Sequence, residues 1–200
     1  LEEKGKRILM INPAMNRILE YGKSPEDYYQ LTRFSLKWML IKALERRGIS
    51  YIHGSGVKFG DDSFFFTGPP NHGKTRNLVT FLDRGGSFIT DDTIFYGENG
   101  EIPFQIKSKI IKDLSETFPK LKRAVNSEHH IRLDDVGWLI DLTKIYPYEE
   151  KCVEPSGLFF LYAWNSNETR IKQISKKEML SRLKNGSSLA SLQAKTAPTS

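Results

Sequence analysis

Residues 68–75 read Gly-Pro-Pro-Asn-His-Gly-Lys-Thr and match the G-x-x-x-x-G-K-T pattern of a phosphate-binding loop. In such a loop, glycines allow backbone N–H groups to turn inward around phosphate oxygens, and the following helix presents its positive end to the same anion. Lys74 would contact the terminal phosphates, and the Thr75 hydroxyl can bind Mg²⁺. A plain Gly/Pro loop is the alternative, but it does not explain a Lys-Thr pair at a helix start. We therefore expect the nucleotide to contact Gly68, Pro69, Pro70, Asn71, His72, Gly73, Lys74, Thr75 and Arg76.

Two adjacent carboxylates, Asp91 and Asp92, follow Lys74 by 17 and 18 residues. A helix of about ten residues leads roughly 15 Å away from the loop, and a short strand returns most of that distance. If this crossover is parallel and right-handed, both acids lie at the carboxyl end of a strand, where open α/β sheets bind ligands. One of these carboxylates can hold a metal ion, directly or through water, and the other can accept a proton from an attacking hydroxyl. A simple Asp-Asp turn or helix cap is the alternative.

His53 is the third candidate, and a predicted hairpin brings it to the loop. Residues 50–59 and 63–67 are strand-like, and a Gly-Asp-Asp turn signal lies between them. If Phe59 pairs with Asp62, His53 lies opposite the first glycine of the loop. A cation or hydrogen-bond donor there could steady a phosphoryl group during transfer. A purely structural strand histidine is the alternative.

The remaining pattern predicts a mixed α/β domain. Strands are expected over residues 7–11, 50–59, 63–67, 87–90, 94–96, 102–106, 138–142, 158–164 and 168–174. Helices are expected over residues 25–47, from the loop to about residue 84, and over 176–184, whereas 107–125 form either a helix or an excursion. We expect one domain over residues 1–185, with a lead-in over 1–49, a core over 50–185 and a disordered tail over 186–200.

Composition excludes several classes of protein. No apolar run approaches the roughly 20 residues of a membrane-spanning helix, so no membrane partner is expected. The opening residues lack the apolar stretch of a secretory signal, and the single cysteine, Cys152, excludes an internal disulfide framework. A reducing cytoplasm is therefore the expected compartment. The net charge of +6 suits a polyanion or a nucleotide phosphate, although a mixed solvated surface explains it as well.

Together, His53-Gly54, the hairpin, the loop, Arg84-Gly85 and Asp91-Asp92 resemble the catalytic domain of HPr kinase/phosphorylase and its smaller relatives. The resemblance is specific over residues 50–96 and weaker elsewhere. It implies a P-loop-containing mixed β-sheet with flanking helices, of the phosphoenolpyruvate-carboxykinase-like kind, and phosphorylation of hydroxyl groups with ATP or another NTP and Mg²⁺.

By this resemblance, Lys74 is the phosphate-binding lysine, and Thr75 and Asp91 are the metal-side residues. Asp92 is the proton acceptor and His53 the active-site histidine. The chain departs from the family at Asn71-His72, where the family usually has Ser-Gly. It also lacks a Glu-Ile-Arg-Gly segment after the aspartates, and only Gln105 stands near that place, which leaves the second metal ligand unassigned.

Three functions are compatible with these residues. The first is a kinase that transfers the γ-phosphate of ATP to a Ser/Thr-type hydroxyl of a protein, peptide or small molecule. The second is a nucleotide-binding regulatory or interaction module with little catalysis. The third, NTP hydrolysis coupled to nucleic acid, rests on charge alone, because no aromatic-basic recognition motif is evident. Nucleic acid is therefore not an expected partner, and a homo-oligomer is open because relatives with this domain often assemble.

Overall fold

The computed structural model describes residues 8–11, 17–21, 36–104, 107–127, 130–134, 137–163 and 168–186. The chain divides into two compact units, Leu1–Ser50 and Tyr51–Ser200. The expectations for residues 7, 25–35, 105–106, 164 and 187–200, Gln105 among them, fall outside the described residues.

The first unit contains a small hairpin and a helix. Strands β1 (Ile8–Ile11) and β2 (Ile18–Tyr21) pair antiparallel, which confirms the predicted first strand and adds a second that was not predicted. Residues 36–45 are helical, within the range expected for the long helix. A turn over residues 46–48 ends this helix, and Gly48 takes a left-handed φ of 78° there.

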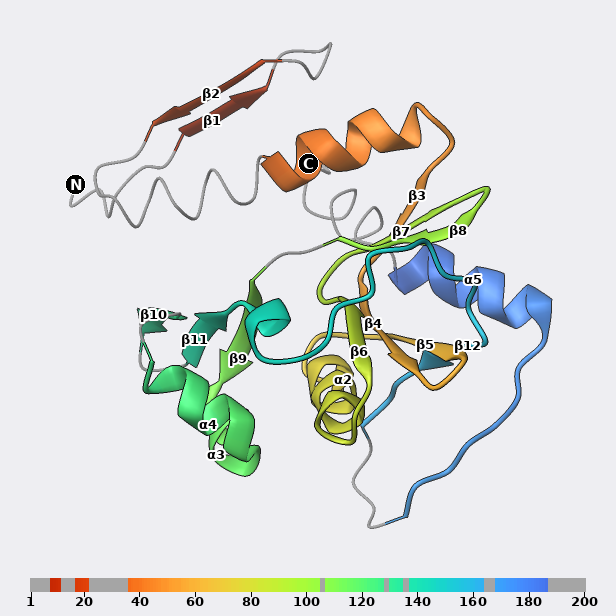
Figure 1. The fold of residues 1–200 in the computed structure, drawn as a ribbon. Coiled ribbons are helices and arrows are strands. Elements are labelled where there is room, and N and C mark those ends of the chain that lie inside the picture. The colour runs from red at the N-terminus through yellow and green to blue at the C-terminus, as the bar shows by residue number, and fades with distance from the viewer. Residues whose placement is uncertain are drawn as a thin grey trace, which may run out of the picture. The chain divides into compact units, whose positions relative to one another are not determined.

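A four-stranded mixed sheet forms the centre of the second unit (Figure 1). Its order is β12-β5-β4-β6, with bounds Gly157–Phe160 for β12, Asp62–Thr67 for β5, Gly54–Phe59 for β4 and Ser87–Thr90 for β6. Strand β4 is antiparallel to both β5 and β6, so β5 and β6 run in the same direction on either side of it. Strand β12 is parallel to β5. The mixed α/β class expected from the sequence is therefore present.

The β4–β5 hairpin has the predicted register. Phe59 pairs with Asp62, and Gly54 at the other end pairs with Thr67. The expected strand over residues 50–59 is broken at His53, however. Its first part, β3 (Ser50–Ile52), joins a separate sheet with β7 (Ile94–Gly97) and β8 (Gly100–Ile102).

Glycine at position 54 permits close packing just after this break. A Cβ atom at Gly54 would lie 2.6 Å from both the Phe66 carbonyl oxygen and Ile94 Cδ1. The sequence pattern could not reveal this break, because both halves are strand-like and it depends on tertiary packing.

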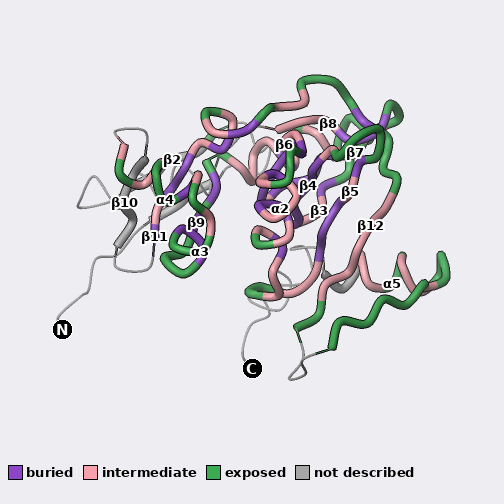
Figure 2. The backbone as a smooth tube through the Cα atoms, turned by 60° about the horizontal axis from the view of Figure 1, so that its bottom comes forward, coloured by how far each residue is buried: buried purple, intermediate pink, exposed green. Residues whose placement is uncertain are grey.

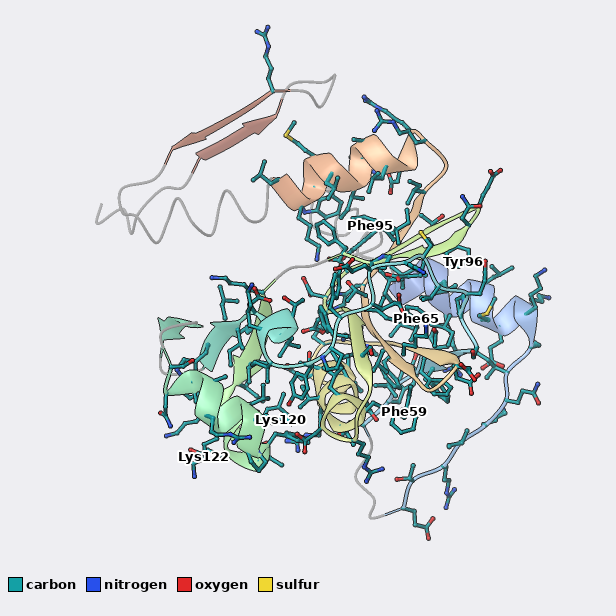
Figure 3. The ribbon with its side chains drawn as sticks, in the orientation of Figure 1. Phe59, Phe65, Phe95, Tyr96, Lys120 and Lys122 are labelled. Carbon is teal, nitrogen blue, oxygen red and sulfur yellow. The ribbon has the colours of Figure 1, made fainter. Side chains whose placement is uncertain are left out.

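Helix α2 (Lys74–Asp83) contacts β4, β5 and β6. Phe64 and Phe66 belong to the core on the helix side, whereas Phe65 joins a second cluster with Ile89 and Ile94. This division follows from the alternation of side chains along a strand. Figure 3 labels Phe65 and, from β7 of the other sheet, Phe95, both of which are buried.

The segment after β8 is an excursion that includes two short helices. It consists of β9 (Ser108–Ile111), α3 (Lys112–Thr117) and α4 (Pro119–Val125). Pro119 begins α4, which explains why one continuous helix does not form. Strand β9 pairs with β11 (Gly137–Ile140), which pairs with β10 (His130–Asp134), and buried residues of β9, α3, α4 and β11 share the core with α2.

Four of the later strand predictions need correction. Of the described residues in the strand expected over 102–106, only Ile102 lies in a strand, because β8 ends there, and the strand expected over 158–164 ends at Phe160, the last residue of β12. The expected strand over 138–142 ends at Ile140, because Asp141 caps a short 3₁₀ helix, η1 (Leu142–Lys144), by accepting a bond from the Thr143 N–H at 3.1 Å. The expected strand over 168–174 is wrong: these residues form no strand.

The terminal helix α5 (Lys176–Gly186) is present as predicted. In Figure 2 the segment before α5 is exposed, whereas β4, β5 and β6 are largely buried. None of the helices in the described part of the chain combines the length and apolar character needed to span a bilayer.

Candidate active site

The loop between β5 and α2 contains the glycine-rich motif. Gly68 has φ 140°, Asn71 φ 63° and Gly73 φ 85°, so three of its residues lie in backbone regions that favour glycine or asparagine. Gly73 is the residue before the first turn of α2, and that turn contains no acidic side chain. The positive end of a ten-residue helix thus faces the loop without a neutralising carboxylate of its own.

Lys74 folds back over this loop. Its Nζ donates to the carbonyl oxygens of Gly68 at 3.0 Å and Pro69 at 2.8 Å. Burial lowers the pKa of Lys74, and the charges of Asp92 and Asp91 act in the opposite direction. The ammonium group therefore donates hydrogen bonds to the loop, and it lies close enough to both carboxylates for their charges to raise its pKa.

Thr75, at the start of α2, contacts Asp91. The Thr75 hydroxyl donates to Asp91 Oδ1 at 3.2 Å, and Asp91 is only 4% exposed. Burial, and secondarily the neighbouring charge of Asp92, raises the pKa of Asp91 to about 6, while Ser108 and Thr75 act against that rise. A hydroxyl and a carboxylate side by side provide the hard oxygen ligands that Mg²⁺ prefers.

Asp92 is more exposed than Asp91 and contacts His53. His53 Nδ1 lies 3.1 Å from Asp92 Oδ1 and 3.0 Å from the Asp92 carbonyl oxygen. The Asp92 side chain is 38% exposed, so its carboxylate is accessible while its neighbour is buried. Asp92 also has a left-handed φ of 67°, an unusual conformation for a residue with a side chain.

The sheet explains why these residues converge. Strands β5 and β6 run in the same direction, so the loop after β5 and the acids after β6 lie at the same edge. The intervening β4 runs the other way, and His53 directly precedes it at that edge. The Thr67 hydroxyl donates to the His53 carbonyl at 2.9 Å and ties the two strands together at this point. The structure thus brings together His53, Lys74, Thr75, Asp91 and Asp92.

Two predicted loop residues have side chains engaged elsewhere. Arg76 forms an ion pair with Asp113 of α3, so its guanidinium contacts that helix. His72 Nδ1 lies 2.8 Å from the Pro70 carbonyl oxygen, and its ring contacts Tyr162 edge-on at 6.1 Å between centroids.

Several polar residues that support the site were not predicted from the sequence. The Ser55 hydroxyl donates to the Lys74 carbonyl at 3.2 Å, and Asn77 Nδ2 donates to the Gly73 carbonyl at 3.0 Å. Asn77, four residues beyond Gly73, could have been found from helical spacing. Ser55 and Ser108 come from other strands, and nothing in the local pattern marks them.

The described residues contain no cluster of three or more His, Cys, Asp or Glu side chains able to hold a metal ion. The candidate metal site therefore consists of Thr75 and Asp91, to which phosphate oxygens and water would have to add. A scan against protein-family models and a search of curated proteins found no match to this chain.

Proposed function

We propose that the second unit is a P-loop kinase domain of the HPr kinase-like kind, which transfers the γ-phosphate of ATP to a hydroxyl group. One observation carries this proposal: a lysine, a hydroxyl, two carboxylates and an imidazole converge from three chain segments on one edge of the sheet. Phosphoryl transfer requires positioning and charge stabilisation, and these residue types supply both.

Each residue has a distinct proposed role. Lys74 would leave the Gly68 and Pro69 carbonyls to contact the terminal phosphates of the nucleotide. Thr75 and Asp91 would hold Mg²⁺, which neutralises charge on the phosphates when it is bound. The backbone N–H groups of the loop and of the first turn of α2 would bind phosphate oxygens.

The accessible Asp92 is the proposed proton acceptor. The acceptor hydroxyl oxygen forms a bond to the γ-phosphorus, the bond from that phosphorus to the ADP oxygen breaks, and the hydroxyl proton moves to Asp92. His53 orients the Asp92 carboxylate through the 3.1 Å contact between Nδ1 and Oδ1. The proposed acceptor is a hydroxyl-bearing protein, peptide or small molecule. We also expect the chain to act in the cytoplasm, and a homo-oligomer is compatible with this function.

Asp92→Asn tests this assignment. We expect this variant to bind MgATP within about twofold of wild type, because Asn keeps the shape and tolerates the left-handed backbone. Transfer of labelled γ-phosphate to lysate fractions or free serine should fall about 100-fold or more, as expected for loss of a general base. Asp61→Asn, in the exposed turn between β4 and β5, is the matched control and should transfer at the wild-type rate. An unchanged rate in Asp92→Asn would refute the role of Asp92.

A nucleotide-binding module with little catalysis is the second candidate. It is favoured because the described residues contain no group of three or more His, Cys, Asp or Glu side chains that could hold a metal ion. Calorimetry with MgATP, run beside the transfer assay, separates the two functions. Tight binding without transfer to any acceptor would support the module and contradict the kinase.

A further inference from the structure

An exposed aromatic ring lies beside the phosphate loop. Tyr162 is 58% exposed, and the guanidinium carbon of Arg182, from α5, lies 5.3 Å from the centre of its ring. The same guanidinium is 5.8 Å from the ring of Phe160, and the His72 ring of the loop lies 6.1 Å from that of Tyr162. We call Tyr162, Phe160 and Arg182 the aromatic platform.

The parallel pairing of β12 and β5 fixes the platform next to the loop. Phe160 pairs with Thr67, and the Leu161 N–H donates to the Thr67 carbonyl at 2.8 Å. A Cβ atom at Gly68 would lie 2.4 Å from the Leu161 carbonyl oxygen, so the two backbones are in close contact. Tyr162 therefore leaves the sheet directly beside the first residue of the loop, and α5 lies near the end of β12 in Figures 1 and 2.

The platform and the acids lie on opposite flanks of the loop. In the sheet order, β12 is on one side of β5, while β4 and β6, which position His53 and the acids, are on the other. The terminal phosphate of a nucleotide must face the acids if transfer occurs there. The α-phosphate and the nucleoside then extend toward the opposite flank, where β12 ends.

Packing of α5 explains only part of this arrangement. Arg182 forms an ion pair with Glu178 at 2.6 Å, and its contact with Phe160 helps to hold α5 against β12. Neither of these two contacts requires the large and mostly exposed ring of Tyr162, which follows the end of β12 beside the loop. A base stacked on such a ring would remove apolar surface from water.

We propose that Tyr162 receives the nucleobase of the bound nucleotide by stacking, with Arg182 supporting the ring from α5. This inference rests on the proposed nucleotide binding and names the surface that contacts the base. Every base has a π-face, and stacking on the platform uses this face without hydrogen bonds to the edge of the base. Adenine and guanine should therefore stack equally well, so ATP and GTP should bind with similar affinity.

The test compares a nucleotide with a ligand that has phosphates but no base. Binding of MgATP and of inorganic tripolyphosphate with Mg²⁺ is measured by calorimetry on the full chain. Tyr162→Ala should weaken MgATP binding about tenfold, which is within the range for loss of one base–aromatic stack, and leave tripolyphosphate binding unchanged. Tyr162→Phe should bind both ligands like wild type, because it keeps the ring. Tyr96→Ala removes another exposed tyrosine, on β7, and should change neither affinity.

The outcomes separate the two proposals. If wild type binds ATP but Tyr162→Ala binds it equally well, base stacking on Tyr162 is refuted, whereas nucleotide binding at the phosphate loop is still supported. If Tyr162→Ala loses both ligands to the same degree, Tyr162 supports the loop and does not contact the base. If wild type binds neither ligand, nucleotide binding itself is refuted and the platform with it.

Discussion

Asp91 and Asp92 are adjacent in the chain but have different surroundings. Asp91 is buried against Thr75 with a raised pKa, whereas Asp92 is accessible and contacts His53. Asp92 also has a left-handed φ. The different surroundings of the two carboxylates suit the two proposed roles, in which Asp91 holds a metal ion and Asp92 accepts a proton.

The spacing of these acids from the loop could be predicted, because strand and helix lengths follow local patterns. Their difference in burial could not, since it arises from tertiary packing and from the left-handed φ of Asp92, which no local signal marks.

Glu101 provides a test of a buried residue outside the site. It lies on β8 with no exposed surface, and neither carboxylate oxygen has a hydrogen-bond partner among the described residues. Burial raises the pKa of Glu101 to about 8. The pKa of Tyr148 is also raised, mainly by its own burial and secondarily by the charge of Glu101.

We predict that Glu101 makes the folded state less stable as the pH rises. In the unfolded chain this carboxyl ionises around its ordinary pKa of 4.5, while in the folded chain it stays protonated until about 8, so the stabilising contribution is lost across that interval. The loss is at most about 5 kcal/mol from the difference between these two pKa values, 4.5 and about 8.

Urea unfolding of wild type and Glu101→Gln at several pH values measures this effect. Because the pKa of Asp91 is raised to about 6, the free energy of unfolding of both proteins also declines as the pH rises over a lower range. The informative quantity is therefore the difference in the free energy of unfolding between wild type and Glu101→Gln at each pH. Glu98→Gln, an exposed glutamate in the same hairpin, should keep the wild-type profile. Parallel pH profiles for wild type and Glu101→Gln would contradict the prediction.

At the scale of elements, the β4–β5 hairpin and the loop were the most predictable parts. The turn signal and the strand lengths fix the hairpin register, and the Gly-Lys-Thr sequence marks the start of α2. The predicted strand over 168–174 failed because Ile171 is 84% exposed and no neighbouring strand pairs with the segment. A strand-like composition is insufficient without a partner strand and a buried face.

The pairing of β12 with β5 links segments about ninety residues apart, so no local pattern could predict it.

This pairing predicts a steric requirement at Gly68. Gly68→Ala should reduce the free energy of unfolding by about 1–3 kcal/mol more than Gly85→Ala, because its Cβ would lie 2.4 Å from the Leu161 carbonyl oxygen. Gly85 is the matched control, since it also has a positive φ but has open space around its Cβ position. Denaturant unfolding of both variants makes the comparison, and equal losses would show that β12 does not press on the loop.

At the scale of the molecule, the mixed α/β class could be predicted from the alternation of elements, but the sheet order could not. The second unit combines a core shared by α2 and the β9–β11 sheet with the proposed ligand-binding edge at the ends of β5 and β6. Ligand binding at that edge would stabilise the folded state only, because its residues come from three separate segments.

We predict that MgATP raises the melting temperature of the chain. A ligand present at 100 times its dissociation constant raises the free energy of unfolding by about 2.7 kcal/mol. For a protein of this size, this increase raises the melting temperature by roughly 5–10 °C. Lys74→Met should lose most of this shift, because it removes the charge that is proposed to contact the phosphates. Differential scanning calorimetry with and without MgATP measures the shift for each protein. A shift of equal size in Lys74→Met would exclude the loop as the binding site.

The β4–β5 turn lies at the far end of the hairpin from His53. The six-residue strands place it about 20 Å away, and a Cβ at Gly60 would meet no atom within 4 Å. A peptide inserted there would add loop-closure entropy that grows only with the logarithm of its length, while the paired strands hold the register on both sides. This tip is therefore a suitable attachment point for a fluorescent or affinity tag in any assay of the chain.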